Sequence, residues 1–299
     1  MSLSRKRNDI LFFALCVLPP LLLYMVFYIY PTLNTFWLSL FEYSGIGGAM
    51  TFVGLENFAY ILKDEHLLKS FGNNLILMLF VPFPTLIIAL GSAAALSRKD
   101  LKERNFYRTV FFFPSILSFV VVAIVWYFIY SPNSGLLNNC LNALGLKALA
   151  LPWLGDSRTA LGAIIVVLIW QAFGYYMVMY IAGIDSIPQE LYEAAEVDGA
   201  SPFKQFYKIT IPLLWPVIRI TLVFMIGGTI TISFLVANVL TAGGPNFATD
   251  TALNQMYRQG TINANYGYAM AIAVVVFLFS MILSMISNRL TNREEKTHG

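Results

Sequence analysis

The stretch FLFSMILSMI, residues 277–286, is uncharged and shows no alternation of apolar and polar positions. A strand of an outer-membrane barrel would alternate over about 10 residues. A helix that crosses a bilayer needs about 20 consecutive apolar residues, and this stretch lies inside a charge-free run over residues 259–288. The stretch therefore predicts a membrane-spanning helix near the end of the chain.

Similar charge-free runs recur along the rest of the chain. They cover residues 10–41, 70–97, 109–146, 159–184 and 220–249. The 299 residues are 58% hydrophobic and 12% charged, with a mean hydropathy of +0.69, which lies outside the range of soluble domains. The sequence predicts an all-α integral membrane protein with six transmembrane helices in a single domain over residues 1–299. The expected spans are 10–41, 71–97, 109–130, 160–184, 216–239 and 267–288.

The cations predict the orientation of these spans. Most of the 19 Lys and Arg residues lie at the termini, after the second and fourth spans, or at the start of the fifth. They are Arg5, Lys6, Arg7, Arg98, Lys99, Lys102, Arg104, Arg108, Lys204, Lys208, Arg219, Arg289, Arg293 and Lys296; the others are Lys63, Lys69, Lys147, Arg158 and Arg258. Cytoplasmic segments carry the excess of cations, so both termini are expected in the cytoplasm. The cations form no basic patch with interleaved aromatics, so membrane lipid and no nucleic acid is the expected partner.

The cytoplasmic connection over residues 185–215 contains strong helix signals. Ser186 and Gln189 have the spacing of a capping box, and Pro188 is tolerated in a first helical turn. Gly199 suits the left-handed position that follows a helix end. The sequence therefore predicts a short helix that ends at Gly199.

A second short helix is expected directly after this glycine. Ser201 followed by Pro202 is typical of a helix start. Apolar residues then share one face at i, i+3, i+4 spacing: Phe203, Phe206 and Tyr207. Pro212 is expected to end this helix. The connection would form two short helices that meet at a glycine corner on the membrane surface.

The first of these helices has acidic side chains and small side chains on its surface. Glu190 and Glu193 lie three residues apart and share one side, while Ala194 and Ala195 leave room for the groove of another protein. This pattern favours a docking element. An amphipathic helix that lies on the bilayer is the alternative, although such helices usually present Lys and Arg to anionic lipid.

Residues 187–214, IPQELYEAAEVDGASPFKQFYKITIPLL, resemble the EAA loop of permease subunits of binding-protein-dependent ABC importers, in the carbohydrate branch. Glu193, Ala194, Ala195 and Gly199 match the pattern, and Ile211 stands where the family usually has leucine before the proline. Further matches are GLENF at 54–58, FFFPSILS at 111–118 and LTAGGPNFATDT at 240–251. The last stretch is more similar to the first maltose-permease subunit and its glycerol-phosphate relatives than to the second subunit of such pairs.

The resemblance implies a function and a set of partners. The chain would form half of the path of a sugar importer in a bacterial or archaeal inner membrane. It would pair with a homologous permease, two ATPase subunits and an extracytoplasmic binding protein. The loop would form coupling helices that enter a cleft of the ATPase, with Glu193 in contact with it and Gly199 shaping the turn. The positions assigned to coupling are Glu190, Tyr192, Glu193, Ala194, Ala195, Asp198, Gly199 and Ala200.

The chain itself shows no energy source. It lacks the G-x-x-x-x-G-K-[ST] phosphate cradle, so no cofactor is expected on it, and ATP and Mg²⁺ would bind the partner ATPases. Ion coupling usually needs an acid or a histidine inside the bilayer, and the expected spans contain none in their interiors. His66 is expected in an outer loop and His298 in the tail. An ion-coupled transporter or a channel for a neutral solute remains the alternative, since carbonyls and hydroxyls can bind sodium.

Enzymatic function is not indicated by any motif. No G-x-S-x-G elbow, no H-E-x-x-H pair and no paired intramembrane aspartates occur. The acids of the 185–215 connection have no histidine nearby. We therefore expect no catalytic residue and no metal site.

Polar and aromatic residues in the fourth and fifth spans are candidates for the solute path. An uncharged, hydroxylated solute needs hydrogen-bonding groups and flat apolar faces. The candidates are Trp170, Gln171, Tyr175, Gly228, Thr229 and Ser233. Close helix packing and an interfacial position explain the same residue types equally well. Outside, the TAGGPN stretch is expected to be a flexible loop that meets the binding protein.

Overall fold

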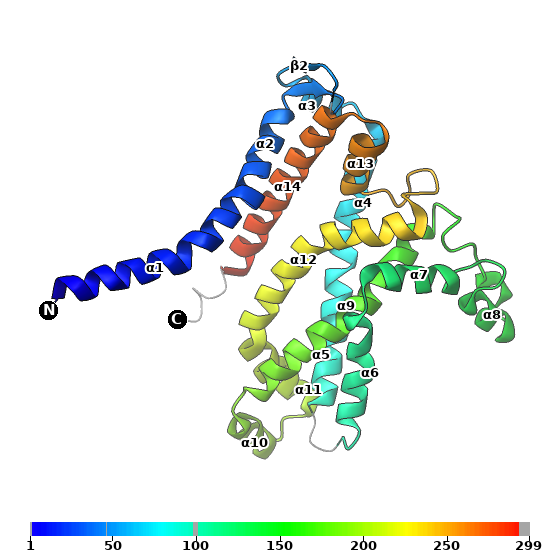
Figure 1. The fold of residues 1–299 in the computed structure, drawn as a ribbon. Coiled ribbons are helices and arrows are strands. Elements are labelled where there is room, and N and C mark those ends of the chain that lie inside the picture. Colours follow the sequence, from blue (N-terminus) through cyan, green and yellow to red (C-terminus); the bar gives the residue numbers. More distant parts are fainter. Residues whose placement is uncertain (1, 46, 98–100, 293–299) are drawn as a thin grey trace. The chain divides into compact units, whose positions relative to one another are not determined.

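The computed structural model describes residues 2–45, 47–97 and 101–292. Of the residues discussed above, Arg98, Lys99, Arg293, Lys296 and His298 lie outside this range. The chain divides into two compact units (Figure 1). Unit 1 contains Met1–Asp64 and Met256–Phe277, and unit 2 contains Glu65–Gln255 and Leu278–Gly299. The expectation of one domain over residues 1–299 remains a prediction.

Unit 1 begins with a long apolar helix. Helix α1 (Ser2–Tyr24), a π-helical turn (Met25–Ile29) and α2 (Tyr30–Leu38) follow one another without a break. The antiparallel strands β1 (Phe41–Tyr43) and β2 (Met50–Phe52) come next, with Phe41 opposite Phe52, and α3 (Glu56–Ile61) follows. The first helical segment therefore ends at Leu38, close to the approximate predicted bound at residue 41, because the strand pairing begins at Phe41.

The GLENF motif holds the hairpin of unit 1. Asn57 donates hydrogen bonds from Nδ2 to the carbonyl oxygens of Ser39 (2.9 Å) and Phe41 (3.0 Å). Both acceptors lie where the chain leaves α2 and enters β1. The Tyr268 hydroxyl donates to Asp64 Oδ2 at 2.8 Å. Side-chain amides of this kind satisfy backbone carbonyls that no ladder reaches, so the motif has a structural role.

Unit 2 is a bundle of helices. Its helices are α4 (Glu65–Phe80), α5 (Pro82–Leu96), α6 (Arg104–Ile116), α7 (Phe119–Ile129), α8 (Leu136–Ala143), a 3-10 turn (Lys147–Leu149), α9 (Ala160–Asp185), α10 (Gln189–Val197), α11 (Pro202–Gln205), a π-helical turn (Phe206–Thr210) and α12 (Ile211–Thr241). Helices α13 (Ala252–Tyr257) and α14 (Tyr266–Asn292), separated by a π-helical turn (Arg258–Ile262), each contribute to both units.

The number of spans agrees with the sequence prediction when one broken helix is counted as a span. In the described part of the chain, five helical segments are long and apolar enough to cross a membrane. They are Phe13–Leu38, Glu65–Leu96, Ala160–Asp185, Pro202–Thr241 and Tyr266–Ile286. Helices α6 and α7 together form a sixth, but they are bent by 100° relative to each other.

One further span prediction and the predicted location of His66 need correction. Residues 109–130 were expected as one helix, whereas Leu117 and Ser118 are extended, with ψ of 144° and 138°, and separate α6 from α7. Hydropathy does not detect this break, because it reports composition and not backbone dihedrals. His66 was expected in a loop but lies in the first turn of α4, which begins at Glu65.

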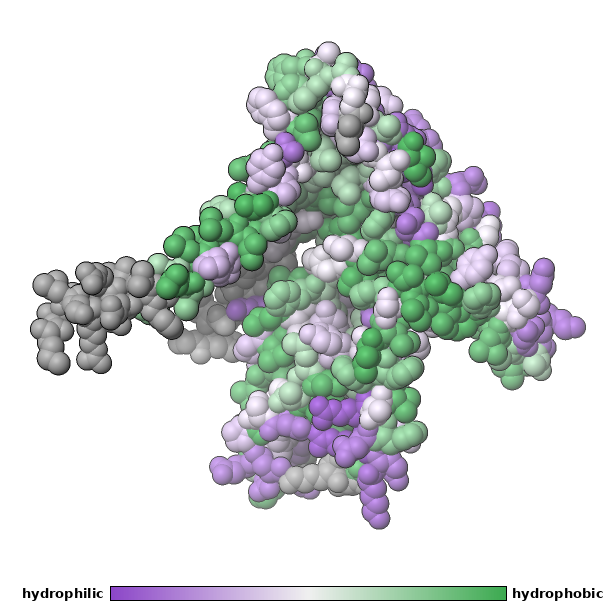
Figure 2. Space-filling model, viewed as in Figure 1, coloured by the Kyte–Doolittle hydropathy of each residue, from purple (hydrophilic) through white to green (hydrophobic). Residues whose placement is uncertain are grey.

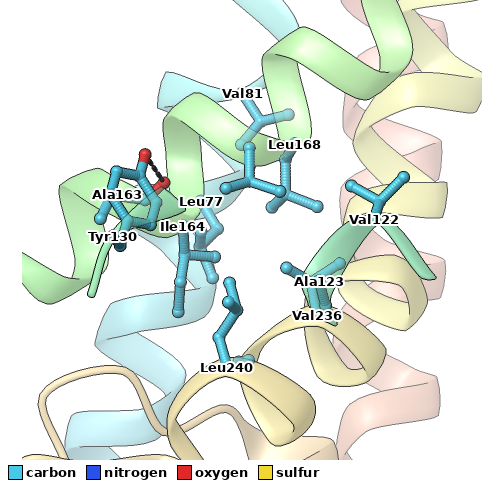
Figure 3. Packing of buried hydrophobic residues seen from close by; sticks show 12 residues of the cluster. Leu77, Val81, Val122, Ala123, Tyr130, Ala163, Ile164, Leu168, Val236 and Leu240 are labelled. Atoms are coloured by element: carbon cyan, nitrogen blue, oxygen red, sulfur yellow. Dashed lines mark hydrogen bonds between the residues drawn. The ribbon is translucent and has the colours of Figure 1, made fainter. Parts of the chain in front are cut away.

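Helix α9 forms the centre of unit 2, where it packs against α5, α6 and α12. One of the apolar clusters around it is shown in Figure 3 and includes Leu77, Val81, Val122, Ala123, Tyr130, Ala163, Ile164, Leu168, Val236 and Leu240. The Tyr130 hydroxyl donates to the Ala163 carbonyl at 3.1 Å. A Cβ at Gly174 would overlap the carbonyl of Phe111. Helices α6 and α9 are thus in backbone contact, which only glycine permits here.

Candidate functional site

The connection between α9 and α12 contains a glycine corner, as the sequence predicts. The backbone of Gly199 has φ of +73°. The Ala200 N–H donates to the Ala195 carbonyl (2.8 Å) and the Gly199 N–H to the Glu196 carbonyl (3.0 Å). These two bonds form a Schellman motif, which satisfies carbonyls at the helix end. Helix α10 therefore stops at a fixed place and direction.

The start of α10 differs from the prediction. Ser186 does not cap α10. Its hydroxyl donates to the Gly183 carbonyl at 2.6 Å, at the end of α9, and the N-cap position of α10 is Pro188. The capping-box prediction was wrong because Ile187 and Pro188 lead α10 out of α9, so the serine belongs to the preceding helix end.

The second helix begins as predicted and ends elsewhere. Ser201 is its N-cap, and the Ser201 hydroxyl accepts from the Lys204 N–H at 3.4 Å. Pro212 does not end this helix, because α11, the π-helical turn and α12 continue as one helical segment, Pro202–Thr241. The Ile211 N–H donates to the Phe206 carbonyl, which widens the turn just before Pro212. A widened turn accommodates a residue that lacks a donor.

Hydroxyl contacts join α10 and α9 to this long helix. The hydroxyls of Tyr192 and Thr210 lie 2.9 Å apart, and those of Tyr180 and Thr221 lie 2.7 Å apart. A Cβ at Gly183 would overlap the Leu214 side chain, so α9 and α12 approach closely there. The start of the long helix is therefore joined to α10 by a side-chain contact as well as through the chain itself.

The corner presents acidic and apolar groups together. Glu190, Glu193, Ala194, Asp198 and Gly199 are exposed, while Tyr192, Ala195 and Ala200 are half-buried. Figure 2 shows hydrophilic residues gathered at the end of unit 2 that carries α10 and α11. Val197 is 89% exposed and Phe203 is 72% exposed. Sequence analysis did not single out these two residues as docking groups, because an apolar residue near a membrane is usually assigned to lipid.

An ion pair closes the same end of the bundle. Arg104 Nη2 at the start of α6 lies 2.8 Å from Asp185 Oδ2 and 3.1 Å from Oδ1 at the end of α9. Both side chains remain partly exposed. The pair links the start of the broken span α6–α7 to the end of α9. The two residues are 81 positions apart, so no local sequence pattern predicts the pair.

The six solute-path candidates do not share one accessible surface. Gln171 (6% exposed), Thr229 and Ser233 are buried within unit 2, and Gly228 is half-buried. Thr229 and Ser233 donate to carbonyls of their own helix, at Met225 (2.7 Å) and Ile230 (3.0 Å).

The two aromatic candidates differ from each other. Trp170 is half-buried and packs edge to face against Trp126, with 5.5 Å between the ring centroids. Tyr175 is 51% exposed. Trp170 and Gln171 therefore lie on the core side of α9 and Tyr175 at its open edge. Their role as path residues remains a prediction.

Comparisons with known proteins place the chain in a family. Residues 87–296 match the family described as binding-protein-dependent transport system inner membrane component. The chain belongs to this family. It is 36% identical over 281 residues to the probable ABC transporter permease YurN of Bacillus subtilis. The aligned residues cover 93% of this chain and 96% of YurN. It is 30% identical over 300 residues to the diacetylchitobiose uptake permease NgcF of Streptomyces coelicolor, covering 96% and 85%.

A solved structure gives the same fold for this permease. A bacterial ABC transporter that imports the acidic polysaccharide alginate matches with a TM-score of 0.84 and 24% identity, over 97% of this chain and 98% of that one. The prediction of an all-helical ABC importer permease fold is therefore confirmed, with the small hairpin β1–β2 as an addition.

The residues that follow the TAGGPN stretch are tightly held in this permease. Asp250 is fully buried, and Asp250 Oδ1 accepts from Asn254 Nδ2 (2.6 Å) and the Thr251 N–H (3.1 Å), while Oδ2 accepts from Gln255 Nε2 (2.8 Å). Asn73 Nδ2 of α4 donates to the Asp250 carbonyl at 2.9 Å. The flexibility of TAGGPN itself, and its contact with a binding protein, remain predictions.

Metal binding has no support in the described residues. Within residues 2–45, 47–97 and 101–292, no three His, Cys, Asp or Glu side chains are grouped so that they could hold a metal ion.

Proposed function

We propose that this chain is the permease subunit of an ATP-driven importer for sugars or oligosaccharides. The observation that carries the proposal is the corner α10–Gly199–α11, which is exposed and yet joined by the Tyr192–Thr210 contact to the helical segment that continues into α12. A surface that is open to a partner and fixed to membrane-spanning helices suits the transfer of movement from an ATPase to the bundle.

The corner would bind the ATPase subunit through complementary charge and shape. Glu193 would contact a basic side chain of the ATPase, while Val197 and Phe203 would fill an apolar groove of the same subunit. Exposed acids add little affinity but set orientation, whereas buried aromatic anchors supply most of the binding energy. Closure of two ATPase subunits would then move α10 and, through Tyr192 and Thr210, the start of α12.

Partner subunits supply what this chain lacks. ATP and Mg²⁺ would bind two separate ATPase subunits, since the sequence has no phosphate cradle. A second, homologous permease would complete the path, because six spans form half of the twelve that we expect. A structure similar in fold contains an alginate transporter together with an oligosaccharide-bound periplasmic protein, which supports a solute-binding protein as the outer partner. We place both termini in the cytoplasm from the distribution of Lys and Arg.

The carbohydrate class follows from relatives and from residue chemistry. NgcF is named for diacetylchitobiose uptake. Trp170, Gln171 and Tyr175 offer stacking faces and an amide without fixed charge, which suits a neutral sugar. The alginate transporter imports an acidic polysaccharide, so the outer binding protein would decide between these classes.

Reconstitution tests the proposal directly. The assembled importer in liposomes should take up its sugar only when ATP, the ATPase subunits and the loaded binding protein are all present. Glu193→Gln should lower ATP-driven uptake without loss of membrane insertion, whereas Glu103→Gln, an exposed acid outside the loop, should have no effect. Uptake by the chain alone without ATP would instead establish a channel or an ion-coupled transporter.

A further inference from the structure

A groove of about 230 Å³ lies on unit 2 between α6 and α9. Its lining residues are Arg108, Thr109, Phe112, Phe113 and Ile116 of α6 and Val178 of α9. All the charge is therefore at one end of the groove, and the other end is apolar. None of these residues was assigned to coupling or to the solute path.

Arg108 differs from its neighbour one helical turn earlier. Arg104 is paired with Asp185, whereas no carboxylate among residues 2–45, 47–97 and 101–292 forms an ion pair with Arg108. The Thr109 hydroxyl donates to the Asn105 carbonyl at 2.9 Å, so it has no proton left to donate into the groove. The guanidinium of Arg108 is thus the group in the groove that can bind an anion, through several donors in a fixed fork.

The groove is long enough to hold most of one lipid chain. Arg108 and Ile116 are eight positions apart on α6, or about 12 Å along a helix, which approaches the half-thickness of a hydrocarbon core of about 30 Å. Phe106 and Tyr107, both exposed, flank the charged end, as aromatic residues do at the headgroup level. The same end of unit 2 carries α10 and α11 (Figure 1).

We propose that this groove binds an anionic phospholipid. Arg108 binds the headgroup phosphate, and one acyl chain lies along Phe112, Phe113 and Ile116 against Val178. Basic pockets between transmembrane helices are typical sites for anionic headgroups. The assignment to the cytoplasmic leaflet rests on the proposed function; lipid binding itself rests only on the membrane location of the chain.

Lipid retention tests this site without ATP or solute. The assembled importer is purified in mild detergent from membranes that contain phosphatidylglycerol and phosphatidylcholine, and the retained lipid is quantified by native mass spectrometry. Wild type should retain phosphatidylglycerol. Arg108→Gln should retain about fivefold less, the effect expected for one cation at a membrane surface. Val178→Phe, which fills the groove and leaves the charge in place, should also lose the lipid.

Each variant has an outcome that overturns the proposal. Lys102→Gln removes an exposed cation of the same end that does not line the groove, and it should retain lipid as wild type does. Equal loss in Lys102→Gln would show nonspecific surface attraction, and full retention in Arg108→Gln or in Val178→Phe would remove the site. Failure of ATP-driven coupling leaves this measurement unchanged, so the two proposals fail separately.

Discussion

The two ends of unit 2 differ in how their acidic residues are placed. At the corner α10–Gly199–α11, acids and apolar residues are exposed, and a few hydroxyl and backbone bonds hold the shape. At the stretch 241–255, the acid Asp250 is buried and accepts hydrogen bonds from two amide side chains and a backbone N–H. The comparison shows that the exposed acids of the corner are open to a partner, whereas the buried Asp250 holds the local structure.

The largest effect is expected from removal of the buried acid. Asp250→Ala leaves the donors of Asn254, Gln255 and the Thr251 N–H without this acceptor. Each unsatisfied buried donor costs about 1–3 kcal/mol, so the variant should lose at least about 3 kcal/mol of stability. Thermal unfolding in detergent measures this loss. Glu42→Ala, at an exposed position, is the control, and equal melting temperatures would contradict the structural role of Asp250.

A smaller effect is expected at the exposed corner. Gly199→Val places a β-branched residue at φ of +73°, which costs about 1–2 kcal/mol and distorts the end of α10. Association with the ATPase, measured by co-purification, should fall while the melting temperature of the bundle changes little. Gly199→Asn should restore association, since asparagine tolerates this backbone region. If the asparagine variant also fails to associate, the ATPase requires a position without a side chain here, and the turn alone is not sufficient.

The Tyr192–Thr210 contact should matter for coupling more than for folding. Tyr192→Phe removes one hydroxyl from a pair 2.9 Å apart, at a cost of about 1 kcal/mol. We expect less sugar transported per ATP hydrolysed, with unchanged membrane insertion. Thr210→Val should give the same ratio, and the double variant should add nothing further. Additive losses would mean that the two hydroxyls act separately.

The smallest effect is expected from the exposed ion pair. Arg104→Gln and Asp185→Asn each remove one partner of a half-exposed bridge, and such pairs contribute about 0.2–1 kcal/mol. A double-mutant cycle on the melting temperature should give a coupling energy in this range that decreases with added salt. A coupling energy independent of salt would show that the pair is shielded in the assembled protein.

The sequence predicts this fold best where composition or a single residue type determines the local structure. Charge-free runs locate the membrane helices, because burial in lipid requires apolar side chains. Gly199 was predictable, since a positive φ at a helix end strongly favours glycine. The family resemblance of residues 187–214 placed the loop correctly within the fold.

Local sequence signals were misleading where contacts with a neighbouring helix determine the structure. Ser186 has the spacing of a cap for α10 but bonds to the end of α9. Pro212 is read as a stop, yet a widened turn carries the helix through it. The Asp250 network includes Asn73, 177 positions away, and no local pattern reports such a contact. The role of the solute-path candidates stays a prediction, because in the proposed importer a second permease would line the path as well.

The bend of 100° between α6 and α7 has a consequence for solvation. At Leu117 and Ser118 the backbone leaves the helical pattern, so carbonyls just before the bend lose their usual donors. The Leu117 N–H donates to the Pro114 carbonyl at 3.3 Å, so one of these carbonyls keeps a donor. Hydrocarbon cannot satisfy the others, because bare peptide groups are tolerated at membrane depth only beside protein or a wet cavity. We therefore expect water, or a surface of another subunit, to satisfy these carbonyls at the elbow.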